Sequence, residues 1–260
     1  MKDNVCRGLM NMNIVKDVLR AGKTAIGTTA SLTSPMGLLA DAGFDFILFD
    51  TQHLSVEIKE LQPQIQAMKG KRASPIIRVG TNDQALICYA LDIGARGIIV
   101  PMVNTKEEAI DVIQWCKYPP EGKRSNAGKR GEWGEFENYS EYMSAVNEEL
   151  LIIPMIETME SMNNIEEILA VPGVDVLLVG PSDLSINLGL TLDYLNPKYQ
   201  EALDNIVSAC ENAGVYPGMY FIPGGQDPSG FVERGFKFFT LSWRRWATAG
   251  IQNGLATIKR

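Results

Sequence analysis

Two apolar segments constrain the fold of this chain more than any other feature: LIIPMI at residues 151–156 and VDVLLVG at residues 174–180. Their apolar residues are nearly continuous rather than alternating, which is typical of strands buried on both faces of a parallel sheet. Between the segments, Ile165, Ile168 and Leu169 recur at helical spacing before Pro172 and Gly173 end the helix. The pattern therefore predicts a strand, a helix and a second parallel strand.

Each of these predicted strands leads to a carboxylate. Glu157 follows the first, and Asp183 follows the second within the sequence PSDLS. Because the carboxyl ends of neighbouring parallel strands share one edge of a sheet, we expect the two acids to lie close together. Such an oxygen-rich pair suits Mg²⁺ or Mn²⁺ better than zinc. The alternative is that each acid only caps the helix that follows it.

The same alternation of strand and helix runs along the whole chain. Predicted strands lie at residues 24–30, 44–50, 75–79, 97–100, 151–156, 174–180, 215–221 and 238–242. Predicted helices lie within the first 20 residues and at 34–43, 56–69, 83–94, 105–115, 140–149, 161–171, 197–213, 228–234 and 244–260. Eight strands alternating with helices over 260 residues predict one (β/α)8 barrel domain spanning residues 1–260, with a doubly wound sheet as the alternative.

Asn82 is expected to cap the helix at 83–94, and Thr105 with Glu108 has the spacing of a capping box for the next helix. Residues 118–139 lack an apolar period and are rich in glycine and charge. A loop of this length in a compact fold is usually functional or disordered.

Composition narrows the class of ligand and the compartment. A net charge of -7 argues against a nucleic acid or an anionic membrane as partner, so a small molecule is expected. The four cysteines, Cys6, Cys88, Cys116 and Cys210, are too far apart to suggest a zinc site or a disulfide framework. No apolar segment has the length of a signal sequence core or a membrane span, so a cytoplasmic location is expected.

In a barrel of this kind the active site forms at the carboxyl ends of the strands, where His53, Arg78, Glu157 and Asp183 fall. His53 is the only histidine and would carry any proton transfer by imidazole, unless its role is structural. Arg78 lies in an apolar strand, where it needs an anion: either a ligand oxyanion or one of the site acids. Asp92 alone is an ordinary acid near a helix end. No lysine follows a predicted strand, which favours a metal over Schiff-base chemistry.

Six segments together resemble the HpcH/HpaI-type metal-dependent aldolases. They are AGFDFILFDTQH, PIIRV followed by ND, ALDIGARGIIVPMVNTKEEA, YPPEGKR, PMIET and VPGVDVLLVGPSDLS, and they extend over nearly the whole chain. The resemblance implies a homohexameric (β/α)8 barrel, a lyase that cleaves 4-hydroxy-2-oxo acids to pyruvate and an aldehyde through a metal-stabilised enolate.

The resemblance also implies roles for individual residues. Glu157 and Asp183 would be the metal ligands, and Arg78 would stabilise the enolate oxygen. His53 would act as the base, with Asp92 fixing its tautomer as the second member of a dyad. The backbone amides of Ser182 and Asp183 would hold the pyruvate carboxylate, since a helix N-terminus favours an anion.

The chain departs from the family pattern at several positions. Thr51 and Gln52 replace the usual Gly-Glu before the histidine, and Met155 replaces a glutamine two residues before the metal glutamate. Ser125 replaces a glycine, and Trp243 and its neighbours replace an acid after the eighth strand. We expect these departures to affect substrate choice and efficiency but not the metal site.

Two other functions are consistent with the pattern. One is a carbon–carbon lyase for an acyl-CoA thioester, whose phosphates would need the cations of the long loop, Lys123, Arg124, Lys129 and Arg130. The loop is more simply expected to close over the aldehyde end of the site or to pack on a neighbouring subunit. The other is a 2-oxo acid binding protein that has lost catalysis.

Overall fold

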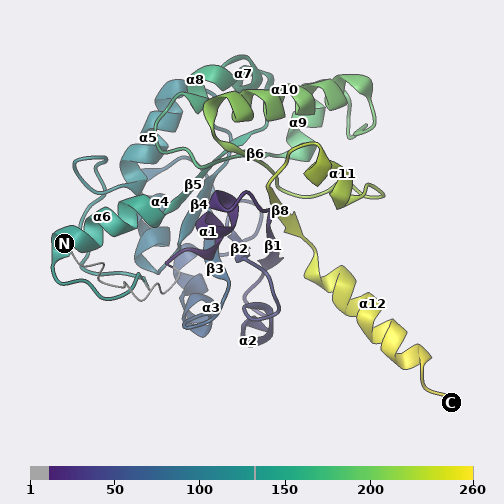
Figure 1. Cartoon of the computed structure of the whole chain (residues 1–260), viewed down its shortest axis with the longest axis horizontal. Helices are drawn as coiled ribbons and strands as arrows, with labels where there is room; N and C mark the ends of the chain where they lie inside the picture. The colour runs from purple at the N-terminus through teal and green to yellow at the C-terminus, as the bar shows by residue number, and fades with distance from the viewer. Residues whose placement is uncertain (1–11, 132, 260) are drawn as a thin grey trace, which may run out of the picture.

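The computed structural model describes residues 12–131 and 133–259. Its eight strands form one closed parallel barrel in which each strand pairs with the next along the chain and β8 pairs with β1 (Figure 1). The strands are β1 (Ala25–Ala30), β2 (Phe46–Asp50), β3 (Ser74–Arg78), β4 (Gly97–Val100), β5 (Leu151–Ile156), β6 (Val176–Val179), β7 (Tyr216–Met219) and β8 (Phe238–Leu241). The predicted barrel is confirmed, and the open doubly wound sheet is excluded.

Helices alternate with these strands as predicted. They are α1 (Ile14–Arg20), α2 (Met36–Leu39), the 3-10 turn η1 (Ile58–Leu61), α3 (Gln62–Ala67), α4 (Gln84–Asp92), α5 (Lys106–Cys116), α6 (Tyr139–Glu149), α7 (Met159–Asn163), α8 (Ile165–Leu169), α9 (Pro181–Asn187), α10 (Pro197–Ala213), α11 (Pro228–Glu233) and α12 (Trp243–Ala256). The helix predicted at 56–69 therefore begins as a 3-10 turn. Part of the helix expected in the first 20 residues, together with Cys6, lies outside the described residues.

Helix starts follow local side-chain chemistry, with one correction. The capping box of Thr105 and Glu108 is present at α5. At α4, however, the cap is Asp83, which accepts a hydrogen bond from the amide of Leu86, and not Asn82 as predicted. The side chain of Asn82 instead donates to the carbonyl of Glu108, so it is engaged with the next βα connection.

The alternating pleat of the strands divides the core into two layers. Phe46, Leu48, Ile76, Ile153 and Leu178 point into the barrel, and α1 closes the amino end of this inner layer. The outward-facing residues pack against the surrounding helices. Because side chains alternate, the residue two places after an inward one also points inward. By this rule Asp50, Arg78 and Glu157 point to the inner side of the barrel at its carboxyl end, because they follow Leu48, Ile76 and Ile153 by two or four residues.

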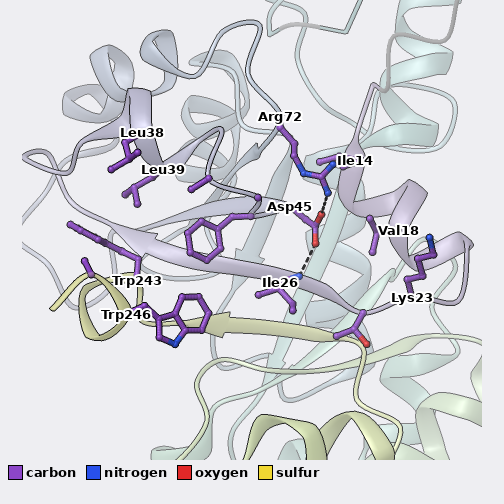
Figure 2. A pocket seen from close by; sticks show the side chains of 15 residues that line it. Ile14, Val18, Lys23, Ile26, Leu38, Leu39, Asp45, Arg72, Trp243 and Trp246 are labelled. Atoms are coloured by element: carbon purple, nitrogen blue, oxygen red, sulfur yellow. Dashed lines mark hydrogen bonds and ion pairs between the residues drawn. The ribbon is translucent and has the colours of Figure 1, made fainter. Parts of the chain in front are cut away.

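The last helix departs from the barrel. Figure 1 shows α12 leading away from β8, and none of its side chains is buried. A groove of about 810 Å³ lies on the flank of the barrel, lined by residues of α1, β1, α2 and the start of α12 (Figure 2). Ile26, which faces outward from β1 into this groove, is 36% exposed. The outer face of β1 is thus left partly uncovered by the chain's own helices.

Within the residues described, none of the helices combines the length and the apolar character needed to cross a bilayer. Cys88, Cys116 and Cys210 are free thiols.

Candidate active site

Arg78 is the last residue of β3, and its side chain is held in a buried ion pair. The Nε and Nη2 atoms of Arg78 donate to the two carboxylate oxygens of Asp50, at 2.8 and 2.6 Å. Asp50 ends β2, and strand register places it directly beside Arg78. The prediction that Arg78 needs an anion is therefore met within the chain, although by Asp50 and not by Glu157 or Asp183.

Asp50 is a site residue that the sequence reasoning missed. The strands β2 and β3 end in residues of opposite charge, Asp50 and Arg78, and consecutive strands are neighbours in a barrel. The sequence could therefore have been used to predict this ion pair. Burial raises the pKa of Asp50, but the hydrogen bonds and charge of Arg78 outweigh burial and hold the pKa below its ordinary value. Asp50 is thus ionised under all ordinary conditions and keeps Arg78 in place.

Glu157 follows β5 and is almost completely buried, with 2% of its surface exposed. Its Oε2 atom accepts a hydrogen bond from the amide of Met102 at 3.0 Å, and Met102 has a φ of 54°. A positive φ is uncommon for a residue with a side chain, so the backbone after β4 accepts strain while it directs this amide at the carboxylate.

Gly180, directly after β6, makes room for the other oxygen of Glu157. A Cβ atom at position 180 would lie 2.1 Å from Oε1 of Glu157. Only glycine therefore allows the carboxylate of Glu157 to cross over the end of the neighbouring strand.

Asp183 lies in the first turn of α9 and is close to Glu157. Burial raises the pKa of Glu157, and the charge of Asp183 raises it further. The helix after β5 is capped by the side chain of Thr158, not by Glu157, and α9 has no side-chain cap. The two acids thus share the carboxyl-end edge, as predicted, without serving as N-caps.

This pair of acids fits a divalent cation. The charge of Arg78 is already matched by Asp50, so the repulsion between Glu157 and Asp183 is left without an equal opposing charge. Carboxylate oxygens are the donors that Mg²⁺ and Mn²⁺ prefer. Among the described residues, no group of three or more acids, histidines and cysteines gathers into a metal site. A cation held here would take its other ligands from substrate and water.

His53 is exposed on the connection after β2. Its charge helps to lower the pKa of Asp50, which places its imidazole near the Arg78–Asp50 pair. His53, Arg78, Glu157 and Asp183 therefore lie at one end of the barrel, as predicted from the strand exits.

Asp92 does not join them. Helix α4 runs antiparallel to the strands, so its last residue lies at the amino end of the barrel, just before the chain enters β4. The carboxylate of Asp92 accepts hydrogen bonds from Arg124 Nη2 at 3.3 Å and from the thiol of Cys88 at 3.8 Å. The dyad of His53 and Asp92 is therefore not formed within one chain.

The long loop between α5 and α6 also lies at the amino end, because it connects a helix to the following strand. Arg124 is 4% exposed and its guanidinium lies 4.6 Å from the ring centre of Tyr118. Trp133 packs beside Arg96, which leads into β4. The loop does not close over the mouth of its own barrel. Lys123, Lys129 and Arg130 are exposed, but they lie at the opposite end of the barrel from Glu157 and Asp183.

Comparison with known proteins supports a common origin. The family model described as HpcH/HpaI aldolase/citrate lyase matches residues 28–244. The 4-hydroxy-2-oxo-heptane-1,7-dioate aldolase of Salmonella typhimurium is 33% identical over 209 residues, which cover 80% of each chain.

Two solved structures have the same fold at similar sequence identity. The HpcH/HpaI aldolase from Desulfitobacterium hafniense superposes with a TM-score of 0.81 at 28% identity, covering 92% of this chain and 95% of the other. Citrate synthase SbnG superposes with a TM-score of 0.79 at 27% identity, covering 93% and 96%. Proteins with this fold and similar sequences thus carry both aldolase and citrate synthase names.

Proposed function

The chain belongs to the HpcH/HpaI aldolase/citrate lyase family, and on this basis we propose that it is a divalent-metal-dependent class II aldolase. Its reaction would be the cleavage of a 4-hydroxy-2-oxo acid to pyruvate and an aldehyde. One observation carries the proposal most directly: Glu157 and Asp183 meet at the carboxyl-end rim beside an arginine already neutralised by Asp50.

Glu157 and Asp183 are the proposed ligands of Mg²⁺ or Mn²⁺. When bound, such an ion supplies Lewis-acid polarisation of the 2-oxo group. Met102 holds Oε2 of Glu157 by its amide, and Gly180 leaves space at Oε1, so the carboxylate is fixed before a cation arrives. This preorganisation favours the two-acid site over an accidental meeting of charges.

Arg78 and His53 are proposed to manage charge and protons. Two donor positions of Arg78 are committed to Asp50, so Nη1 is the edge left to donate to the oxygen at C2 as negative charge develops there. His53 is exposed and can remove the proton of the C4 hydroxyl, after which the bond between C3 and C4 breaks. The backbone amides of Ser182 and Asp183, at the start of α9, are proposed to hold the carboxylate of the 2-oxo acid.

Asp92 can pair with His53 only if a second copy of the chain supplies it, because the two residues lie at opposite ends of one barrel. We therefore assign Asp92 to the dyad across a subunit boundary. Its neighbour Tyr89 is 60% exposed on α4, which leaves this part of the helix available for contact with another copy.

The proposed oligomer also has a second support, in α12. This helix exposes Trp246, Ile251 and Leu255, and Ile258 just after it is exposed as well. The apolar groove beside β1 lies where the eighth helix of a barrel is expected (Figure 2). We propose that α12 of one copy fills the groove of another and receives that copy's helix in return. Such reciprocal exchange makes a closed two-fold dimer, from which the hexamer implied by the family could be built.

The alternatives receive no comparable support. A thioester substrate would need cations near the two acids. Arg124 is buried against Asp92 and Tyr118, and the exposed Lys123, Lys129 and Arg130 lie on the same loop at the opposite end of the barrel. A protein that only binds a 2-oxo acid could use the same pair of Glu157 and Asp183, but it would not need the proposed base, His53, at the same rim. The similarity to a citrate synthase shows only that related chains can differ in substrate.

The activity is tested by mixing the purified protein with Mn²⁺ and a panel of 4-hydroxy-2-oxo acids and measuring pyruvate release with and without a chelator. We expect metal-dependent release that Glu157→Ala abolishes. Glu149→Ala is the matched control, because Glu149 is also a buried acid and pairs with Arg20 at the amino end. Activity that survives in Glu157→Ala and still responds to metal would refute the ligand assignment.

The exchange of α12 is tested by light scattering. Ile251→Glu should place a charge in the apolar groove of the partner and shift the protein toward monomers. Gln252→Glu, on the neighbouring exposed position, should leave the assembly unchanged. Equal assembly of both variants would contradict the proposed exchange.

A further inference from the structure

Tyr220, the first residue after β7, is placed to hold Arg78 from across the barrel. The ring of eight strands closes in chain order, so β7 stands opposite β3. The guanidinium carbon of Arg78 nevertheless lies 4.1 Å from the centre of the Tyr220 ring. The two side chains therefore meet inside the mouth and span it from one wall to the other.

The backbone and the inner core fix the position of this ring. The amide of Tyr220 donates to the carbonyl of Val179 on β6 at 3.0 Å, which continues the ladder between β6 and β7. The side chain packs against the inner apolar layer of the barrel. Tyr220 thus belongs to the rigid end of a strand and not to a mobile loop.

The contacts around Arg78 come from three other strands. Asp50 at the end of β2 takes Nε and Nη2, Tyr220 covers one face of the guanidinium, and the Sδ atom of Met155 on β5 lies 4.0 Å from Nη1. Met155 is two residues before Glu157 on the same strand. The free edge of Arg78 is consequently directed toward β5. The charge of Arg78 offsets a small part of the rise that burial and Asp183 cause in the pKa of Glu157.

We propose that Tyr220 is a positioning residue that presses the guanidinium of Arg78 against Asp50 and so directs Nη1 toward the two acids. This role rests on the proposed function, since it matters only if Arg78 stabilises charge on the substrate. The ring acts through its face, because an aromatic face attracts a guanidinium, and most strongly where water is excluded.

The phenol group supports the same reading. Burial raises the pKa of Tyr220 to about 12, so the side chain stays neutral at working pH. A neutral ring cannot replace Asp50 as the counter-charge of Arg78. Its contribution is therefore orientation, through the ring face over Arg78 and through a hydroxyl that interacts with Asp50 and Arg78. Phenylalanine should supply the larger part of it, which comes from the ring.

The test compares Tyr220→Leu with Tyr220→Phe in the metal-loaded enzyme. Loss of the ring should lower kcat for pyruvate release about tenfold, with a smaller change in KM, because Arg78 is needed most in the transition state. Tyr220→Phe should retain the wild-type kcat within about twofold. Phe236→Leu is the matched control, since Phe236 is a fully buried aromatic just before β8 that packs against Phe231 and Phe239, and its loss should leave kcat unchanged.

A second comparison separates positioning from a general loss of structure. In an Arg78→Lys background, Tyr220→Leu should cause no further fall in kcat, because the fork that the ring orients is already gone. The proposal would be overturned if Tyr220→Leu lowered kcat by the same factor in the Arg78→Lys background as in the wild-type enzyme. It would also be overturned if Tyr220→Leu alone kept the wild-type kcat. If the wild-type enzyme releases no pyruvate from any substrate, the proposed function has failed instead, and the two failures are distinguishable.

Discussion

Two buried arginines at opposite ends of the barrel have nearly the same surroundings. Arg78 lies between Asp50 and Tyr220 at the carboxyl end, and Arg124 lies between Asp92 and Tyr118 at the amino end. Their side chains are 4% and 2% exposed. An arginine, an aspartate and a tyrosine in contact are therefore not by themselves the signature of an active site.

The difference lies in what each arginine has left to offer. Arg78 makes two short hydrogen bonds to one carboxylate and turns its remaining edge toward Met155, two residues before Glu157 on the same strand. Arg124 makes one bond of 3.3 Å to Asp92, and its Nε atom is buried without a hydrogen-bond partner among the described residues. Among the residues that the structure describes, no pair of crowded acids lies beside Arg124, whose contacts fix the long loop against α4. What makes one of these clusters of arginine, aspartate and tyrosine a candidate active site is therefore the residues around it, and not the cluster itself.

The largest expected effect separates the two arginines by activity. Arg78→Ala should lower kcat/KM about a thousandfold, because it removes a donor from the developing oxyanion. Arg124→Ala should instead lower the free energy of unfolding by about 3 kcal/mol, since it breaks a buried pair. It should lower kcat by no more than the loss of about tenfold expected for its partner Asp92. Steady-state pyruvate release and urea unfolding measure the two quantities. A similar loss of activity in both variants would remove the functional distinction between the two ends.

The next prediction tests whether the carboxyl end of one subunit's barrel, with His53, contacts the amino end of another subunit's barrel, with Asp92. His53→Ala should lower kcat about a hundredfold, because it removes the general base. Asp92→Asn should lower kcat about tenfold, because it removes only the acid that orients this base. Co-expression of the two variants in one cell should give mixed oligomers that recover part of the activity. Recovery is expected only if His53 of one copy works with Asp92 of another. The absence of any recovery in verified mixed oligomers would show that Asp92 has only a structural role, as the partner of Arg124 in the long loop.

A third effect concerns the pH dependence of stability at the carboxyl end. The pKa of Asp50 is held below its ordinary value of 3.8, so its stabilising effect is complete above that pH and is lost as pH falls through the lower folded pKa. Asp50→Asn should therefore reduce the free energy of unfolding by about 3 kcal/mol at neutral pH, and the difference from wild type should shrink in acid below pH 3.8.

Urea titrations from pH 7 to pH 3 give this comparison. Asp204→Asn serves as the control, because the pair of Asp204 with Arg234 is exposed and such pairs contribute little. A constant difference between Asp50→Asn and wild type across this range would contradict the role assigned to Arg78.

The smallest effect concerns the thioether beside Arg78. Met155→Leu should change kcat by less than about threefold, because a sulfur 4.0 Å from Nη1 is a weak contact and leucine has a similar volume. Pyruvate release under saturating substrate is sufficient to measure it. A large loss would mean that sulfur, and not only the space it fills, helps to direct the free edge of Arg78.

Local sequence was enough to predict much of the fold. Continuous apolar runs such as residues 151–156 specify strands buried on both faces, and their regular alternation with helices is enough to predict a barrel. The capping box of Thr105 and Glu108 was predicted correctly because both partners lie within one turn. At α4 the same kind of reasoning chose Asn82 over Asp83, since either side chain can cap a helix and only the tertiary contact of Asn82 with Glu108 decides between them.

Topology alone could have corrected one prediction. A helix that follows a strand in a barrel must return to the amino end, so Asp92 near the end of α4 could not reach the strand exits of its own chain. The same rule places the long loop after α5 at the amino end. The expected pairing of His53 with Asp92 within one chain came from reading residues by motif without following the direction of the chain. Packing of the loop on a neighbouring subunit stays a prediction.

The sequence by itself determined the alternation of strands and helices and the closed barrel that they form. It also placed His53, Arg78, Glu157 and Asp183 at strand exits. Tertiary structure alone decided that Asp50 neutralises Arg78, that Tyr220 reaches across the mouth, and that α12 leaves the groove beside β1 open. The physical reason is range. Periodicity records the environment of each residue along its own element, whereas these contacts join side chains from strands that only barrel closure brings together.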